Sequence, residues 1–220
     1  MSNLDIFSAA RRHMVDSQLR PNKVNDDRIL AAMGTIPREL FVPALYRDVA
    51  YMDEDIAVAP GRYLTEPLVL ARLAQAAEIT GTDKVLIVGA ATGYSAAILA
   101  RLAGSVIALD VDAALVATAK ANLLAVGAGN VSVVSGAMEF GAADNGPYDV
   151  ILVDGAIEEV PDVLQRQLVN HGRLLTVVTS QRVGDAVIVR RTGDLFARRG
   201  LFNAQVRPLP GFARAVGFVF

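Results

Sequence analysis

Residues 85–95 read VLIVGAATGYS, a continuous apolar run that passes directly into a glycine-containing turn. An apolar run of this length without polar alternation is typical of a strand buried on both faces of a parallel sheet. A second apolar segment, residues 105–109, leads to Asp110, which follows Gly89 by 21 positions. In a nucleotide-binding βαβ unit the first turn approaches the ligand, and an acid about 20 positions later takes ribose hydroxyls. The spacing therefore predicts a nucleoside site at Gly89, Gly93 and Asp110.

The identity of residue 94 narrows the class of nucleoside. A dinucleotide site requires a third glycine at this point of the turn, and this chain has Tyr94. The turn thus favours a nucleoside without a pyrophosphate, such as S-adenosylmethionine. The alternative is that Gly89 and Gly93 only form a tight turn in another kind of α/β protein, with Asp110 facing solvent.

The rest of the chain after residue 80 repeats the rhythm of strand, turn and helix. Further strands are expected at 131–134, 148–153 and 173–178, with helices at 94–102, 113–125 and 160–168. Strands that alternate with helices in this way indicate a doubly wound, mostly parallel sheet. The β-prone segments 186–191, 202–206 and 215–220, with a hairpin turn at Gly193-Asp194, predict antiparallel C-terminal strands.

The chain before residue 80 has a helical pattern instead. Apolar residues recur at helical spacing between Ile6 and Leu19, a second helix is expected to begin near residues 25–27, and residues 53–63 look irregular. A third helix is predicted over 67–77, with Pro67 in its first turn. We expect a helical region at 1–80 and a sheet-containing core at 81–220, together forming one compact domain.

Composition excludes several classes of chemistry. The chain has 220 residues, 53% of them hydrophobic, a net charge of −2, two histidines and no cysteine. The absence of cysteine excludes disulfides, thiolate zinc sites and cysteine nucleophiles, and two histidines do not make a multi-histidine metal centre. The balanced charge gives no reason to expect nucleic-acid binding. With no signal peptide and no membrane-length apolar run, we expect a soluble cytoplasmic protein that binds neither membranes nor metals.

Three further segments carry a family resemblance. Residues 36–42 (IPRELFV) are similar to a Pro-Arg-x-x-Phe-Val pattern, 50–53 (AYMD) to Tyr-x-Asp, and 61–67 (GRYLTEP) align without a gap with Gly-Gln-Thr-Ile-Ser-x-Pro. With the turn at 89–94, these segments make the chain resemble the protein-L-isoaspartate O-methyltransferase family over nearly its whole length. The resemblance implies a Rossmann-like fold with an N-terminal helical extension, S-adenosylmethionine as cofactor, and methyl transfer to L-isoaspartyl residues of damaged proteins, which is a repair reaction.

The resemblance also implies site residues, several of which depart from the family pattern. Thr65 stands for an active-site serine, Arg62 for a glutamine, Ala91 for a glycine, and Ala137 for an acid that faces the adenine. Cofactor contacts are implied for Gly89, Ala91, Gly93, Tyr94, Asp110, Ala137 and Asp154, and catalytic roles for Thr65 and Arg62 on a loop of the N-terminal region.

The chemistry needs no general base, because an isoaspartyl carboxyl group has a pKa of roughly 4 and is ionised at pH 7. Thr65 and Arg62 are the hydrogen-bond donors expected to hold it, although Thr65 would equally suit a helix N-cap and Arg62 a solvated loop. Asp154 is expected to touch substrate or cofactor, and no acid within the next three residues completes a metal site. Two other functions stay open. The chain could be a methyltransferase of the same fold that acts on RNA or on a small molecule, or a non-enzymatic relative that kept the fold but lost the cofactor or the activity.

Overall fold

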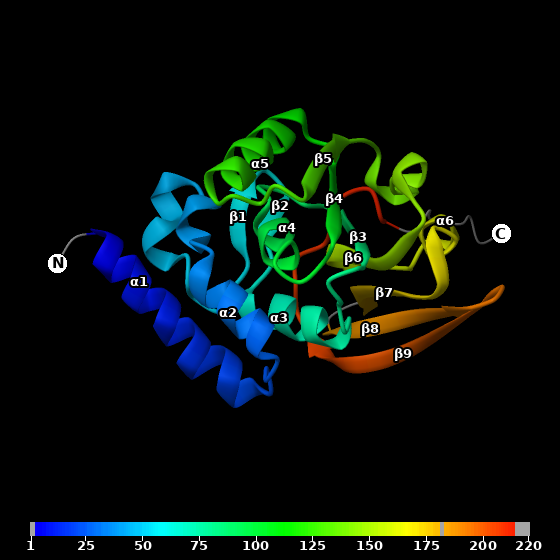
Figure 1. Cartoon of the computed structure of the whole chain (residues 1–220), viewed down its shortest axis with the longest axis horizontal. Helices are drawn as coiled ribbons and strands as arrows, with labels where there is room; N and C mark the ends of the chain where they lie inside the picture. The colour runs from blue at the N-terminus through cyan, green and yellow to red at the C-terminus, as the bar shows by residue number, and fades with distance from the viewer. Residues whose placement is uncertain (1–2, 181–182, 214–220) are drawn as a thin grey trace, which may run out of the picture.

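A seven-stranded sheet forms the centre of the computed structural model, which describes residues 3–180 and 183–213 (Figure 1). The strand order is β5-β4-β3-β6-β7-β8-β9. The strands are β3 (Lys84–Val88), β4 (Ser105–Asp110), β5 (Val131–Ser135), β6 (Tyr148–Ile157), β7 (Leu168–Ser180), β8 (Val183–Thr192) and β9 (Leu195–Ala204). The first five strands in this order are parallel, and β8 and β9 are antiparallel. The expected α/β fold with antiparallel C-terminal strands is confirmed.

Helices flank this sheet, and a short hairpin lies beside it. The α-helices are α1 (Asn3–His13), α2 (Asp27–Thr35), α3 (Pro67–Ala76), α4 (Tyr94–Leu99), α5 (Ala113–Ala125) and α6 (Asp162–Gln165). The π-helical turn η1 (Met14–Leu19) extends α1, and 3₁₀ turns are η2 (Arg20–Asn22), η3 (Arg38–Leu40), η4 (Ala44–Val49), η5 (Met138–Phe140) and η6 (Ala143–Asn145). The hairpin consists of β1 (Ile56–Ala59) and β2 (Arg62–Leu64). Within the described ranges no helix is long and apolar enough to cross a membrane.

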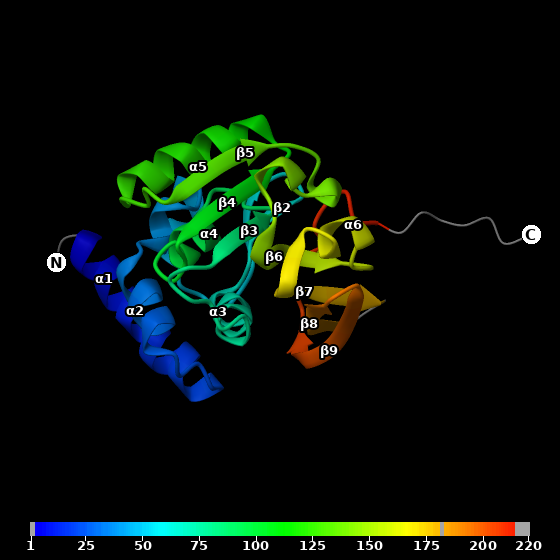
Figure 2. The same cartoon turned by 45° about the vertical axis from the view of Figure 1, so that its right-hand side comes forward.

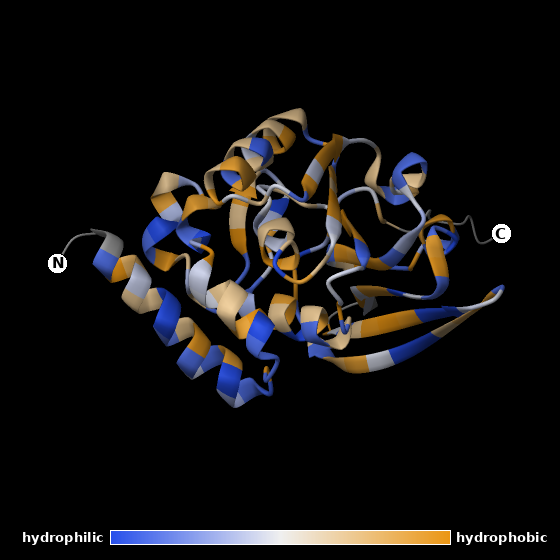
Figure 3. Ribbon diagram, viewed as in Figure 1, coloured by the Kyte–Doolittle hydropathy of each residue, from blue (hydrophilic) through white to orange (hydrophobic). Residues whose placement is uncertain are grey.

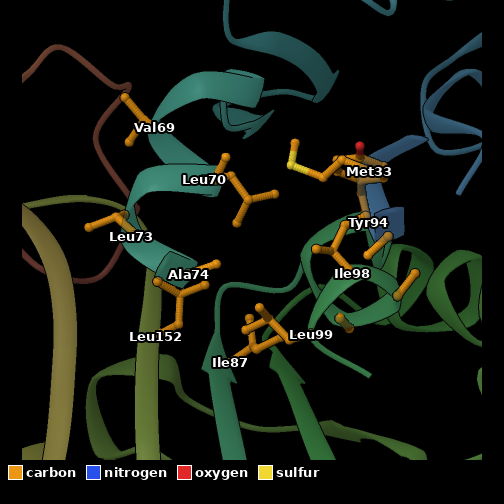
Figure 4. Packing of buried hydrophobic residues seen from close by; sticks show 14 of the residues in the cluster. Met33, Val69, Leu70, Leu73, Ala74, Ile87, Tyr94, Ile98, Leu99 and Leu152 are labelled. Atoms are coloured by element: carbon orange, nitrogen blue, oxygen red, sulfur yellow. The ribbon is translucent and has the colours of Figure 1, made fainter. Parts of the chain in front are cut away.

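The two faces of the sheet are covered very differently. Alternate strand residues point to opposite faces, so Val85 and Ile87 join one buried cluster while Leu86 and Val88 join another. The first cluster includes the N-terminal helices, α3, α4 and part of α5, and Figure 4 shows α3 and α4 packing toward Ile87. The second face is covered by η5, the single turn α6 and the segment that ends at residue 213. Orange stretches mark the apolar central strands in Figure 3.

Several elements differ from the sequence-based expectations, and β6, β7 and β8 are longer than expected. The helix expected at 160–168 is only α6, because Gln167 donates through Nε2 to the Phe140 carbonyl and Leu168 already begins β7. Helix α4 ends at Leu99 instead of 102, and β9 starts well before residue 202. The irregular stretch 53–63 contains the β1–β2 hairpin. The strand expected at 215–220 lies outside the described residues.

The predicted hairpin turn near the C-terminus is confirmed. Thr192 pairs with Leu195, which leaves Gly193-Asp194 as a two-residue connection with φ +59° at Gly193. A positive φ at the first central residue suits the twist of a tight hairpin.

The strand order also fixes where a ligand can bind. From β3 the chain builds outward to β4 and β5, and then returns to place β6 on the other side of β3. Ligands of open α/β sheets bind at such a reversal, beyond the carboxyl ends of the strands. Gly89 follows β3, Asp110 ends β4, and Asp154 lies on β6 where its register shifts.

Candidate active site

The loop after β3 has the backbone conformation of a ligand-binding turn. Gly89 and Gly93 have φ of +85° and +96°, a region that glycine adopts at little cost. Ala91 also has a positive φ, +48°, so the methyl group costs about 1–2 kcal/mol of local strain. Every residue of the loop 89–93 is buried by other parts of the same chain.

Asp110 is held by four hydrogen bonds at the end of β4. Arg62 donates from Nη1 to Oδ1 and from Nη2 to Oδ2, both at 2.6 Å. The backbone N–H groups of Asp112 and Ala91 donate to the same two oxygens at 3.1 and 2.8 Å. The Arg62 and Asp110 side chains are only 5% and 1% exposed. The pair is therefore a desolvated, bidentate ion pair.

Thr65 and Asp154 meet beside Arg62, and the three residues line one small cavity. The Thr65 hydroxyl donates to Asp154 Oδ1 at 2.7 Å across 89 residues of sequence. Burial raises the pKa of the Asp154 carboxyl, while the Thr65 hydrogen bond and the charges of Arg38 and Arg62 act in the opposite direction. Residue 65 therefore presents a hydroxyl beside a carboxyl group that is biased toward its neutral form.

Two carboxylates cap the helix that follows Thr65. Asp55 accepts from the Glu66 N–H at 2.8 Å, and Asp53 accepts from the Leu68 N–H at 3.1 Å. These bonds satisfy N–H groups that the first turn of α3 leaves without a helical partner. The Thr65 side chain takes no part in this cap, because its hydroxyl donates to Asp154.

Arg38 lies in the core next to Thr65. Its guanidinium is completely buried and donates to the Ala50 and Thr65 carbonyls at 2.8 and 3.0 Å. It also lies 4.7 Å from the centre of the Tyr94 ring, a cation–π contact. Sequence reasoning gave Arg38 no role of its own. The available signal was an arginine in the segment 36–42, which is apolar apart from Arg38 and Glu39.

Two of the residues predicted to bind the cofactor have side chains that form no hydrogen bond with Arg62, Thr65, Asp154 or Asp110. The Tyr94 ring is buried in the core against Phe41 and Arg38, as its place among apolar side chains in Figure 4 shows. Ala137 is exposed at the start of η5, one residue after Gly136, whose N–H donates to the Asp110 carbonyl. The structure thus gathers Arg62, Thr65, Asp154, Asp110 and the loop at the sheet reversal.

The C-terminal segment, residues 207–209, packs against Arg62, Thr65 and Asp154. Arg207 and Leu209 form backbone hydrogen bonds with Ala156 on β6. The Leu209 side chain packs so closely on Gly89 that a Cβ built there would lie 2.7 Å from its Cδ1. Figure 2 shows this segment, drawn in red, beside β2 and β6. Sequence reasoning missed this contact because nothing local indicates where an irregular tail folds back.

Two cavities border the site. The smaller, about 10 Å³, is lined by residues that include Arg62, Thr65, Asp154 and Leu209, and this volume is close to that of one water. The larger, about 500 Å³, is lined by Asp53, Glu54, Asp55 and Glu66 opposite residues 204–208. Asp55, Arg207 and Pro208 border both cavities. The larger cavity therefore forms an acidic groove that leads to Thr65.

Glu66 makes the stability of the protein depend on pH. Burial, followed by the nearby carboxylates of Asp53, Asp55 and Glu54, raises its pKa to about 7. The folded protein thus binds a proton more tightly than the unfolded chain, so stability falls as pH rises from about 4.5 to 7. We expect Glu66→Gln to remove this fall and to raise Tm at pH 8 by about 2–4 °C, after solvent screening at a half-buried position. Thermal unfolding at pH 5 and pH 8 measures this, and an equal Tm change at both pH values contradicts it.

Comparisons with known proteins identify relatives that match most of this chain. A protein-family model described as Protein-L-isoaspartate(D-aspartate) O-methyltransferase (PCMT) matches residues 9–203. The Protein-L-isoaspartate O-methyltransferase of Koribacter versatilis (strain Ellin345) is 40% identical over 205 residues, which cover 93% of this chain and 92% of that protein. The protein of the same name from Methanoregula boonei is 39% identical over 204 residues, which cover 93% and 94%.

Solved structures show the same architecture. A protein-L-isoaspartate O-methyltransferase matches with a TM-score of 0.78 at 24% identity, covering 91% of this chain and 67% of that one. A putative protein-L-isoaspartate O-methyltransferase from Plasmodium falciparum, in complex with S-adenosyl-L-homocysteine, matches with a TM-score of 0.76 at 16% identity, covering 91% and 98%. At these identities the solved structures establish the fold.

Proposed function

Because this chain belongs to the protein-L-isoaspartate(D-aspartate) O-methyltransferase family, we propose that it is an S-adenosylmethionine-dependent carboxyl O-methyltransferase that acts on L-isoaspartyl residues of damaged proteins. The observation that carries the proposal is the meeting of the loop 89–93, Asp110 and the Thr65–Asp154 pair at the sheet reversal. A candidate nucleoside site and a hydroxyl donor thus lie together at the carboxyl edge of the sheet. Methyl transfer requires this proximity, because the cofactor's methyl group and the substrate carboxylate must be held next to each other.

The residues at this site are of the types that would bind S-adenosylmethionine. The backbone of Gly89, Ala91 and Gly93 would hold its amino-acid part, and the Asp110 carboxylate is the acceptor type that ribose hydroxyls need. When bound, S-adenosylmethionine supplies an electrophilic methyl group. In the described conformation, however, every acceptor position of Asp110 is taken and Leu209 covers Gly89.

The residues of this chain have to bind and orient the substrate carboxylate. That group is already an anion at pH 7, so no residue has to remove a proton from it. Burying an anion without partners is costly, so the site must offer donors and must not place a second anion beside it. We propose that Thr65 and Arg62 are these donors. Burial favours the protonated form of Asp154, which would donate its proton to the Thr65 oxygen and so leave the Thr65 O–H for the substrate carboxylate.

We further propose a cytoplasmic protein without nucleic-acid partners, built as one domain from regions 1–80 and 81–220. A chain without cysteine forms no disulfides, so nothing in it requires an oxidising compartment. One buried cluster that includes Met14, Leu70 and Ile87 supports joint folding of the two regions.

A peptide assay tests the proposed activity. The substrate is a short peptide with one L-isoaspartyl residue flanked by lysines, since the groove beside Thr65 is lined by four acidic residues. The control peptide has the same sequence with ordinary aspartate. We expect methyl transfer from labelled S-adenosylmethionine to the isoaspartyl peptide only. Transfer to neither peptide at saturating cofactor contradicts the proposal, and equal transfer to both contradicts the substrate class.

A further inference from the structure

The Arg62–Asp110 ion pair lies where the cofactor's ribose is expected to bind. A carboxylate offers about four acceptor positions on its two oxygens. Here each oxygen accepts one bond from Arg62 and one from a backbone N–H. We infer that Arg62 is an internal competitor of the cofactor: its guanidinium occupies the ribose acceptor Asp110, and S-adenosyl ligands bind only when the β1–β2 hairpin releases it. This inference rests on the proposed function and specifies how access to that site is controlled.

The surroundings of the pair support a closed state. Arg62 is the first residue of β2, and its side chain is buried. The Ala91 N–H, which belongs to the cofactor loop, is also used by Asp110. Leu209 rests on Gly89, and the cavity that remains between Arg62 and Asp154 has room for about one water.

The two occupants of Asp110 exclude each other. A guanidinium forms a charge-assisted, bidentate pair with a carboxylate, whereas ribose hydroxyls are neutral donors. Ribose therefore does not displace Arg62 without additional contacts elsewhere on the ligand. The observed association constant equals the intrinsic association constant multiplied by the fraction of molecules in which Asp110 is free. Removing the guanidinium should consequently strengthen binding, although it deletes a buried ion pair.

Calorimetric titration with S-adenosylhomocysteine tests the competition. We expect Arg62→Gln to bind at least tenfold more tightly than the wild type, and Arg62→Lys, which keeps the charge but loses the bidentate geometry, to lie between them. Arg173→Gln is the matched control. It removes an ion pair of the same 2.6 Å length, to Asp83, away from the site, and should bind like the wild type. Equal or weaker binding by Arg62→Gln overturns the inference.

A double-mutant cycle shows whether Arg62 acts through Asp110. In the Asp110→Asn background the ion pair is already absent, so adding Arg62→Gln should change the affinity less than twofold. A tenfold gain that persists in this background contradicts competition for Asp110. Should Arg62→Gln fail to fold, Arg62→Lys takes its place in the cycle, and Arg62→Lys binding no tighter than the wild type then overturns the inference.

Hydrogen exchange on the wild type gives a readout that requires no variant. Saturating S-adenosylhomocysteine should speed exchange of the amides that pair β1 with β2, residues 56–64, while protecting those of the loop 89–93. Ligand binding with an unchanged hairpin overturns the inference while leaving the proposed function intact. Binding by Arg62→Gln but not by the wild type supports the inference and contradicts the proposed activity. Absence of binding by both overturns the two together.

Discussion

Replacement of Arg38 by alanine should lower the free energy of unfolding by about 3–5 kcal/mol, the largest stability effect that we expect in this protein. The side chain is completely buried and supplies donors to the Ala50 and Thr65 carbonyls, which would lose their partners. Its removal also leaves a cavity beside the Tyr94 ring. Both costs fall on the segment that positions Thr65, so stability and site geometry should be lost together.

Two further variants separate the causes of this loss. Arg38→Met keeps most of the side-chain volume but has no donors, so it should recover the packing part only. Arg198→Ala removes an exposed arginine from β9 and should change stability by less than about 0.5 kcal/mol. Urea unfolding monitored by circular dichroism measures all three. A loss below about 1 kcal/mol in Arg38→Ala would show that the buried guanidinium contributes little net stability.

The sheet could be predicted because its information is local. Each central strand is a short apolar run such as residues 85–88, and each run is followed by a turn and then by helical periodicity. Asp110 could be placed at a strand end by counting residues from Gly89. The β1–β2 hairpin was missed because its strands have only four and three residues, and Pro60-Gly61 between them indicates a turn but not a pairing.

The contacts that define the site could not be predicted in the same way. Arg62 meets Asp110 across 48 residues, and Thr65 meets Asp154 across 89. Which donor reaches which acid depends on the strand order, and no local pattern specifies it. Tyr94 illustrates the same limit. Its position follows the cofactor loop, but the sequence does not say that its ring turns into the core toward Arg38.

Thr65→Val should lower kcat for isoaspartyl methylation about 10²-fold while changing the Kd for S-adenosylhomocysteine less than twofold. Valine keeps the branched shape and removes the hydroxyl, so the substrate carboxylate loses a positioned donor but the cofactor loop keeps its packing. Thr65→Ser is the matched control, because it restores the hydroxyl that the family pattern has, and it should retain most of the activity. Equal activity of the valine and serine variants would contradict a role for the hydroxyl.

Asp154 should then make this activity depend on pH. An ionised Asp154 about 4 Å from the substrate carboxylate would repel it by about 4 kcal/mol at an effective dielectric constant of 20. Burial raises the pKa of Asp154, so its neutral form persists to higher pH than usual, and activity should fall as pH rises through that pKa. Asp154→Asn stays neutral and can donate through its amide to the Thr65 oxygen, which leaves the Thr65 O–H for the substrate, so the variant should remain active and lose this alkaline fall. Profiles of kcat against pH for the wild type and for Asp154→Asn measure this difference. An Asn variant inactive at every pH would mean that the ionised carboxylate itself is needed, because the amide keeps the shape and the acceptor but not the charge.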